Sequence, residues 1–74
     1  MAARRTLQKQ AIVKVMEKAT RPLTVPEIHE YALNICDGLG LATVYRAVNR
    51  LMAKEWLREV NIPGHPSRYE RQSL

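Results

Sequence analysis

The sequence predicts a mainly α-helical domain that closes with a small β-hairpin. Apolar residues recur with helical spacing over most of the chain, and near its end the pattern shortens toward the alternation typical of a strand. With 74 residues, 46 % of them hydrophobic, the chain can form one small core. Three helices followed by a hairpin, with a tight turn between the second and third helices, give the order of a winged helix-turn-helix.

The first helix is expected over residues 6–19. Its apolar side chains share one face, and polar side chains occupy the other. Thr6 is the expected N-cap, and Pro22 prevents the helix from continuing. The buried face should contain Leu7, Ala11, Ile12, Val15, Met16 and Ala19.

The second helix has the clearest start signal. Thr24-Val25-Pro26-Glu27 is a capping box, in which each polar side chain accepts a hydrogen bond from the other residue's backbone N–H. The helix is expected to end at Asp37-Gly38, because glycine readily adopts the left-handed cap conformation. Its buried stripe should contain Ile28, Tyr31, Ala32 and Ile35.

The third helix is expected over residues 41–54, and the hairpin follows it. The helix has an apolar seam, while its opposite face is basic and lacks carboxylates. Residues 56–62 and 68–71 read as two strands, joined by the turn-forming residues 63–67. The seam should contain Leu41, Val44, Val48 and Leu51.

The charge balance favours a polyanionic partner. Twelve Lys and Arg against seven Asp and Glu leave a formal net charge of +5, which suits a phosphate backbone or an anionic lipid surface. No apolar run approaches the ~20 residues that a membrane span requires, and the N-terminus lacks the apolar stretch of a secretory signal.

The residues that could support catalysis or bind metal are few. Cys36 is the only cysteine, so an internal disulfide is excluded and a reducing, cytoplasmic compartment is expected. His29 and His65 are the only histidines, and we expect neither a metal site nor a bound cofactor in this chain. No group of residues resembles a catalytic centre, so the chain is not expected to be an enzyme.

The outward face of the third helix is the candidate DNA-contacting surface. The second helix of a helix-turn-helix presents side chains to base edges in the major groove, where Arg and Asn make bidentate contacts. Two arginines ahead of the first helix could form an arm that reaches a minor groove or phosphates, and the hairpin tip, with His65 and Arg68, could follow the phosphate backbone. A basic helix face can also be merely solvated, and the tyrosine ring could instead pack on the core. The candidates are Arg4, Arg5, Thr43, Tyr45, Arg46, Asn49, Arg50 and Arg68.

The run Gly40-Leu41-Ala42-Thr43-Val44-Tyr45-Arg46 resembles the recognition-helix signature of the ferric uptake regulator family. Thr6-Leu7-Gln8-Lys9 is similar to the start of that family's first helix, with Lys in place of Arg. Leu23-Thr24-Val25-Pro26-Glu27-Ile28 resembles the opening of its second helix, and Arg68-Tyr69-Glu70 resembles the end of its wing.

The resemblance implies a bacterial-type transcription regulator, a repressor that binds double-stranded DNA at AT-rich operators. In the family, the signature tyrosine packs on thymine methyl groups and the next arginine contacts bases or phosphates, which implies these roles for Tyr45 and Arg46. A basic residue just before the first helix reaches the minor groove, and Arg4 or Arg5 occupies that place.

The resemblance also implies what the chain lacks. Family members continue into a C-terminal domain that dimerises and binds zinc and a regulatory metal such as iron. Residues 1–74 are expected to be the winged-helix domain alone, with a homodimer possible only through the missing domain. Pro22 occupies the place of a regulatory-site histidine, and Glu70, which matches that site's carboxylate, cannot hold a metal alone.

A second hypothesis is a docking module that binds another protein and has no specific affinity for DNA. An exposed apolar patch around Met52, Trp56 and Leu57 would favour this hypothesis.

Overall fold

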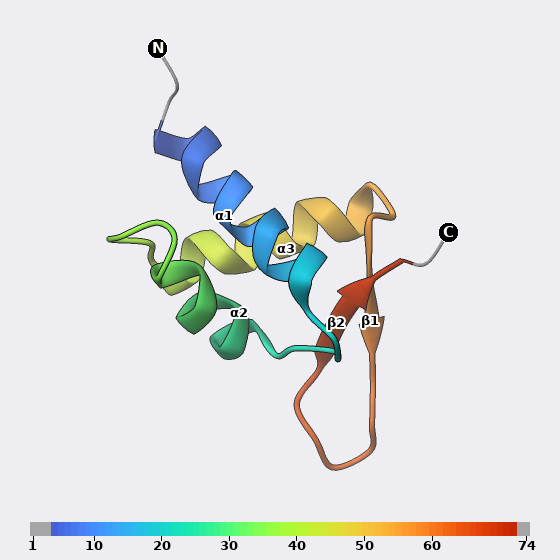
Figure 1. The fold of residues 1–74 in the computed structure, drawn as a ribbon. Coiled ribbons are helices and arrows are strands. Elements are labelled where there is room, and N and C mark those ends of the chain that lie inside the picture. The colour runs from blue at the N-terminus through green and yellow to red at the C-terminus, as the bar shows by residue number, and fades with distance from the viewer. Residues whose placement is uncertain (1–3, 73–74) are drawn as a thin grey trace.

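In the computed structural model, which describes residues 4–72, three helices are followed by an antiparallel hairpin (Figure 1). The predicted fold class and order of elements are therefore confirmed. The elements are α1 (Arg4–Lys18), α2 (Val25–Leu33), α3 (Leu41–Ala53), β1 (Leu57–Val60) and β2 (Arg68–Arg71).

The core lies where the three helices meet, and β1 closes it with one leucine. Each helix contributes one apolar face, as the helical spacing predicts. Four residues expected in the core are instead exposed. Leu7 and Leu41 lie near the N-termini of their helices, where the core does not reach. Tyr31 borders the buried stripe of α2, and Ile35 follows the end of that helix. The core contains Ala11, Ile12, Val15, Met16, Leu23, Val25, Ile28, Ala32, Leu39, Val44, Val48, Leu51 and Leu57.

The start of α1 differs from the prediction. Thr6 lies inside the helix and is not its N-cap, because helical structure already begins at Arg4. Arg4 and Arg5 therefore belong to the first turn of α1 and do not form an arm ahead of it. The Arg4 guanidinium donates a hydrogen bond to the Gly38 carbonyl, with 3.5 Å between Nη2 and the oxygen, which connects α1 to the α2–α3 turn.

The capping box of α2 is present, but the helix is shorter than predicted. The Glu27 N–H donates to Thr24 Oγ1 at 3.3 Å, and the Thr24 N–H donates to Glu27 Oε1 at 2.9 Å. The helix ends at Leu33, because the N–H groups of Ile35 and Cys36 both bond to the Ala32 carbonyl in a tightening turn. Gly38, with φ of 77°, has the predicted left-handed conformation within that turn.

The hairpin is attached both to α3 and to the α1–α2 linker. Glu55, with φ of 60°, reverses the chain between α3 and β1, and Leu57 then pairs with Arg71. β1 is shorter than the predicted 56–62, whereas β2 has the predicted bounds. Leu23 and Tyr69 exchange both backbone hydrogen bonds, at 2.9 and 2.8 Å, so β2 lies between β1 and the linker.

Candidate nucleic-acid interface

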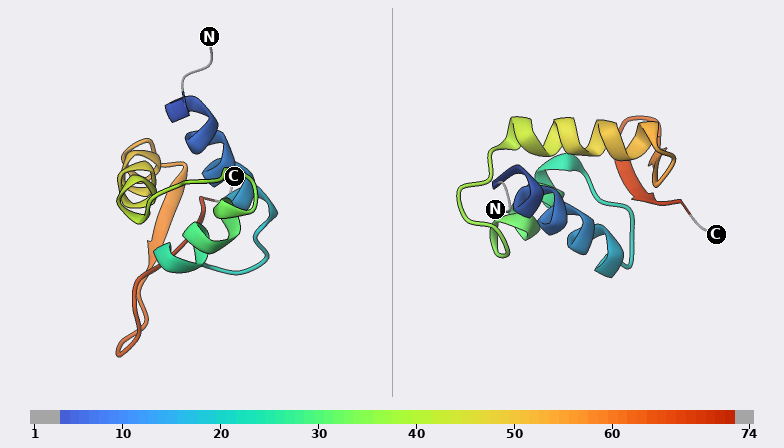
Figure 2. Two further views of the ribbon diagram at one scale, coloured as in Figure 1. Left: turned by 90° about the vertical axis from the view of Figure 1, so that its left-hand side faces the viewer. Right: turned by 90° about the horizontal axis from the view of Figure 1, so that it is seen from above.

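α3 lies along one side of the domain, with α1 and α2 on its other side (Figure 2). Val44, Val48 and Leu51 point into the core, and the exposed residues between them are Tyr45, Arg46, Asn49 and Arg50. Tyr45 is 47 % exposed, so its ring does not belong to the core. The Arg46 guanidinium donates to the Thr43 hydroxyl, with 3.4 Å between Nη2 and Oγ1.

A cleft of about 530 Å³ separates the N-terminal half of α1 from the flank of α3 that faces α1. It brings together four of the predicted residues: Arg5 from α1, and Thr43, Arg46 and Arg50 from α3. Its lining contains no carboxylate, so the basic side chains face one another across the cleft without neutralisation. The full lining is Arg5, Thr6, Gln8, Lys9, Thr43, Arg46, Ala47 and Arg50.

Lys9 belongs to this surface, although the sequence analysis did not select it. The pKa of the Lys9 ammonium is lowered chiefly by its contact with the Lys54 ammonium, with smaller effects of desolvation and of Arg50. Lys9 and Lys54 thus extend the cationic surface beyond the predicted residues. The sequence does hold a signal, because Lys9 follows Arg5 by four residues and must share its helix face.

The other predicted residues lie outside the cleft. Tyr45 and Asn49 are on the exposed surface of α3, and Arg4 is bonded to the Gly38 carbonyl. Arg68 begins β2 and is not at the hairpin tip, and its Nη1 lies 3.5 Å from Glu27 Oε1.

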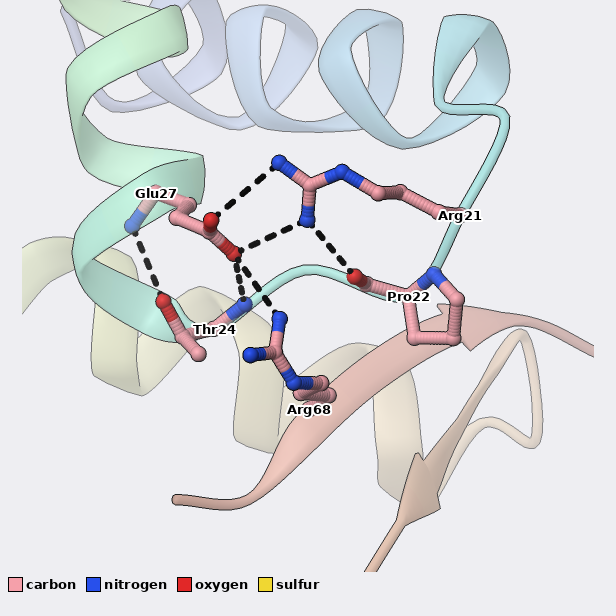
Figure 3. Close-up of polar contacts among 5 residues, drawn as sticks. All are labelled: Arg21, Pro22, Thr24, Glu27 and Arg68. Atoms are coloured by element: carbon pink, nitrogen blue, oxygen red, sulfur yellow. Dashed lines mark hydrogen bonds and ion pairs between the residues drawn. The ribbon is translucent and has the colours of Figure 1, made fainter. Parts of the chain in front are cut away.

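Glu27 connects the start of α2 to the hairpin (Figure 3). The Arg21 guanidinium donates to both of its carboxylate oxygens, at 3.3 and 3.2 Å, and also to the Pro22 carbonyl at 3.2 Å. The hydrogen bond from Arg21, followed by that from the Thr24 backbone, lowers the pKa of Glu27 to about 2. With Arg68 as a third donor, this carboxylate helps to fix the hairpin relative to the helices.

His29 connects α2 to the turn before α3. Its Nε2 lies 2.6 Å from the Leu39 carbonyl oxygen, one residue before Gly40, the N-cap of α3. The nitrogen must carry its proton to donate this hydrogen bond. His29 therefore helps to set where α3 begins.

The described residues do not fit a metal site. No group of three His, Cys, Asp or Glu side chains occurs within residues 4–72. Glu70 accepts a hydrogen bond from Arg58, with 2.6 Å between Nε and Oε2, so an ion pair already uses this carboxylate. In the same part of the chain, no helix is long and apolar enough to cross a membrane.

The apolar patch that would favour a docking module is not present. Leu57 is 2 % exposed, and Met52 and Trp56 pack against the core. The Arg71 guanidinium carbon lies 5.0 Å from the centre of the Trp56 ring and covers part of it.

Three helices, a β-hairpin packed against them and an uncovered basic third helix define a winged helix-turn-helix protein. The family model described as "Ferric uptake regulator family" matches residues 1–74. The chain belongs to this family, and the predicted family resemblance is confirmed.

Solved structures of regulators share the fold. Helicobacter pylori Fur, described as having three functional metal binding sites, matches with a TM-score of 0.83 and 20 % identity, over 92 % of this chain and 47 % of that chain. Vibrio cholerae Fur, whose description names its DNA-binding domains, has a TM-score of 0.81 and 23 % identity, over 92 % of this chain and 53 % of that chain. Streptococcus pyogenes PerR, described in terms of peroxide sensing and gene regulation, has a TM-score of 0.78 and 22 % identity, over 85 % of this chain and 44 % of that chain.

The present chain spans about half the length of these solved structures. A comparison with curated proteins finds no match.

Proposed function

We propose that this chain is the DNA-binding domain of a transcription regulator and that it binds double-stranded DNA with sequence preference. The observation that carries the proposal is the uncovered basic face of α3, which continues across the cleft to Arg5 and Lys9 without a carboxylate. α3 has 13 residues and is therefore about 20 Å long, with a diameter that the major groove accepts. Membership of the family supports the same function.

Within the proposed complex, α3 lies in the major groove and presents three of its side chains to base edges. The exposed ring of Tyr45 offers an apolar edge to thymine methyl groups, and the Arg46 guanidinium can donate to guanine or to a phosphate. Thr43 orients Arg46 through their hydrogen bond. Asn49 lies one turn beyond Tyr45 on the same side of the helix, where its amide can pair with adenine. The family resemblance favours AT-rich operators.

The cleft is proposed to hold the phosphate backbone beside the groove. Arg5 and Lys9 approach it from α1, and Arg50 approaches it from α3. Crowding of like charges is relieved when a phosphate enters, because the anion neutralises several cations at once. Arg4, at the start of α1, is proposed to contact the adjacent minor groove or its phosphates, as other N-terminal arginines do. Arg68 has N–H donors beyond the one directed at Glu27 and is proposed to contact the backbone beside the hairpin.

Sensing and assembly are proposed to reside outside residues 1–74. The zinc, the regulatory metal such as iron, and the dimer contacts of the family are assigned by resemblance to its C-terminal domain. We propose a cytoplasmic regulator whose partner is DNA and which has no catalytic function of its own.

The salt dependence of DNA binding tests the cleft. Fluorescence anisotropy of a labelled duplex, titrated at several salt concentrations, gives the slope of log K against log salt. Arg50→Ala and Lys9→Ala should each reduce the slope by about 1, because each removes one phosphate contact. Lys14→Ala is the matched control, since this lysine is on α1 but outside the cleft. Equal slopes for all three variants would contradict the proposed phosphate contacts.

A further inference from the structure

A second groove lies beside the C-terminal half of α1. It is bounded by that half of α1, the α1–α2 linker and the end of α2, and its volume is about 310 Å³. None of its lining residues belongs to the α1–α3 cleft. The lining is Lys14, Val15, Lys18, Ala19, Thr20, Arg21, Leu23, Tyr31 and Ile35.

The lining of this groove is partly apolar, and two of its large side chains are half exposed. Val15 and Leu23, both almost fully buried, form its apolar base. Tyr31 and Ile35, which the sequence places in the core, are 46 % and 50 % exposed and line the same groove. Neighbouring large apolar side chains in contact with water are typical of a surface that another molecule covers.

Cations border the apolar lining, and no carboxylate is part of it. Lys14 and Lys18 are exposed on α1, and neither forms an ion pair with another residue of the described range 4–72. Arg21 is engaged by Glu27, so the two lysines are the cations available to a ligand. The complement of this surface is a ligand with apolar side chains next to carboxylates.

We propose that the groove binds an acidic amphipathic helix of a partner protein. Apolar side chains spaced by one helical turn would pack against Ile35, Tyr31 and the apolar base, and flanking carboxylates would pair with Lys14 and Lys18. A second copy of this chain is disfavoured because each copy carries a net charge of +5. Nucleic acid would neutralise the lysines but leave Tyr31 and Ile35 in contact with water.

The proposal does not depend on DNA binding. Since the groove and the cleft share no residue, the partner helix and a duplex can occupy the domain together. The partner could in this way be recruited to a site where the domain is bound.

The test is a titration of the ¹⁵N-labelled chain with a synthetic peptide of about 12 residues, long enough to form a helix in the groove. The peptide carries leucines at i and i+4 and glutamates on both sides of them. Amide shifts should saturate with a Kd on the order of 100 μM, appropriate to a small interface, and should map to α1 and the end of α2. A control peptide with lysines in place of the glutamates should bind at least about 10-fold more weakly.

Matched variants identify the surface. Ile35→Asp should weaken peptide binding by about 10-fold or more, because it puts a carboxylate beside the ligand's own carboxylates. Leu33→Asp is the control, since Leu33 is likewise an exposed aliphatic residue, two positions before Ile35, but does not line the groove. Tyr31→Ala, at another half-exposed position, provides a second variant that leaves the core intact. Circular dichroism verifies folding, and duplex anisotropy should be unchanged for Ile35→Asp.

Four results of the peptide titrations would overturn the proposal. They are equal binding of the lysine peptide, no saturation up to about 1 mM peptide, equal loss in Leu33→Asp and Ile35→Asp, and displacement of the peptide by duplex DNA. A concentration-dependent dimer that Ile35→Asp dissociates would assign the groove to a second copy and would also contradict it. The salt slope of duplex binding by Arg50→Ala tests the proposed function separately, and its result does not affect this outcome.

Discussion

Replacing Glu27 with Gln removes the charge that joins α2 to the α1–α2 linker and the hairpin. The amide of Gln can still accept a hydrogen bond from the Thr24 N–H, so the capping box is retained in outline. What is lost is the pairing of a carboxylate with the Arg21 and Arg68 guanidinium groups. The substitution therefore isolates the contribution of charge to the connection shown in Figure 3.

The size of the effect follows from the pKa of Glu27. A fall from 4.5 to about 2 corresponds to about 3 kcal/mol of preference for the charged form. The Glu27 side chain is 34 % exposed and that of Arg21 is 50 % exposed, so solvent screens much of this interaction. We expect the free energy of unfolding to fall by about 1 kcal/mol, which lowers Tm by about 6 °C in a domain of this size.

The pH dependence gives the sign of the effect. Because the folded-state pKa lies below the unfolded one, the native state binds fewer protons between pH 4.5 and about 2, and stability rises with pH there. The contribution of Glu27 is complete above pH 4.5 and is lost as the pH falls through about 2. The Tm difference between the parent chain and Glu27→Gln should therefore shrink by about half at pH 3.

Thermal unfolding followed by circular dichroism measures these differences. Glu30→Gln is the matched control, because Glu30 is exposed on the same helix and is in no ion pair of the described residues. It should change stability by less than about 0.5 kcal/mol. Equal Tm values of Glu27→Gln and Glu30→Gln at pH 7, or an unchanged Tm difference between them at pH 3, would contradict stabilisation by the Glu27 charge.

Three further substitutions test other contacts through urea unfolding. Thr24→Ala removes the hydroxyl of the capping box and should cost about 1 kcal/mol, and a loss below about 0.3 kcal/mol would contradict the cap. His29→Ala leaves the Leu39 carbonyl without its donor and should cost about 1 kcal/mol, whereas His29→Gln should recover part of that loss if donation is what matters. Leu57→Ala should lower the free energy of unfolding by about 2–5 kcal/mol, because it opens a cavity under β1. Leu7→Ala, at a half-exposed position, should lower it much less, and equal losses would argue against the described core.

Local signals in the sequence predicted the fold. The helical spacing of apolar residues and the Thr24–Glu27 capping box act within a few residues. They therefore predicted correctly where α2 and α3 begin. The end of α2 was missed because a turn after Leu33 replaces the helix well before Gly38. The long-range contact to that turn, from Arg4 to the Gly38 carbonyl, leaves no mark on the periodicity.

The contacts that position the candidate site connect residues far apart in the chain. Arg68 reaches Glu27 across 41 residues, and Arg4 reaches Gly38 across 34. Arg4 was expected in a free arm and Arg68 at the hairpin tip, because their partners Gly38 and Glu27 are far from them in the sequence. The basic face of α3 was predictable from its period. The spacing of Lys9 from Arg5 places both on one face of α1, but that this face lies beside α3 is known only from the fold.

Sequence discrimination is the most direct test of the proposed DNA-binding function. Fluorescence anisotropy should compare a labelled AT-rich palindromic duplex with a scrambled duplex of the same composition, across salt, for the parent chain and for Tyr45→Ala. The parent chain should prefer the palindrome even as salt rises, and Tyr45→Ala should lose about 1–3 kcal/mol of that preference. Equal affinity of the parent chain for both duplexes, vanishing with salt, would contradict base recognition by α3 and leave only a cationic surface.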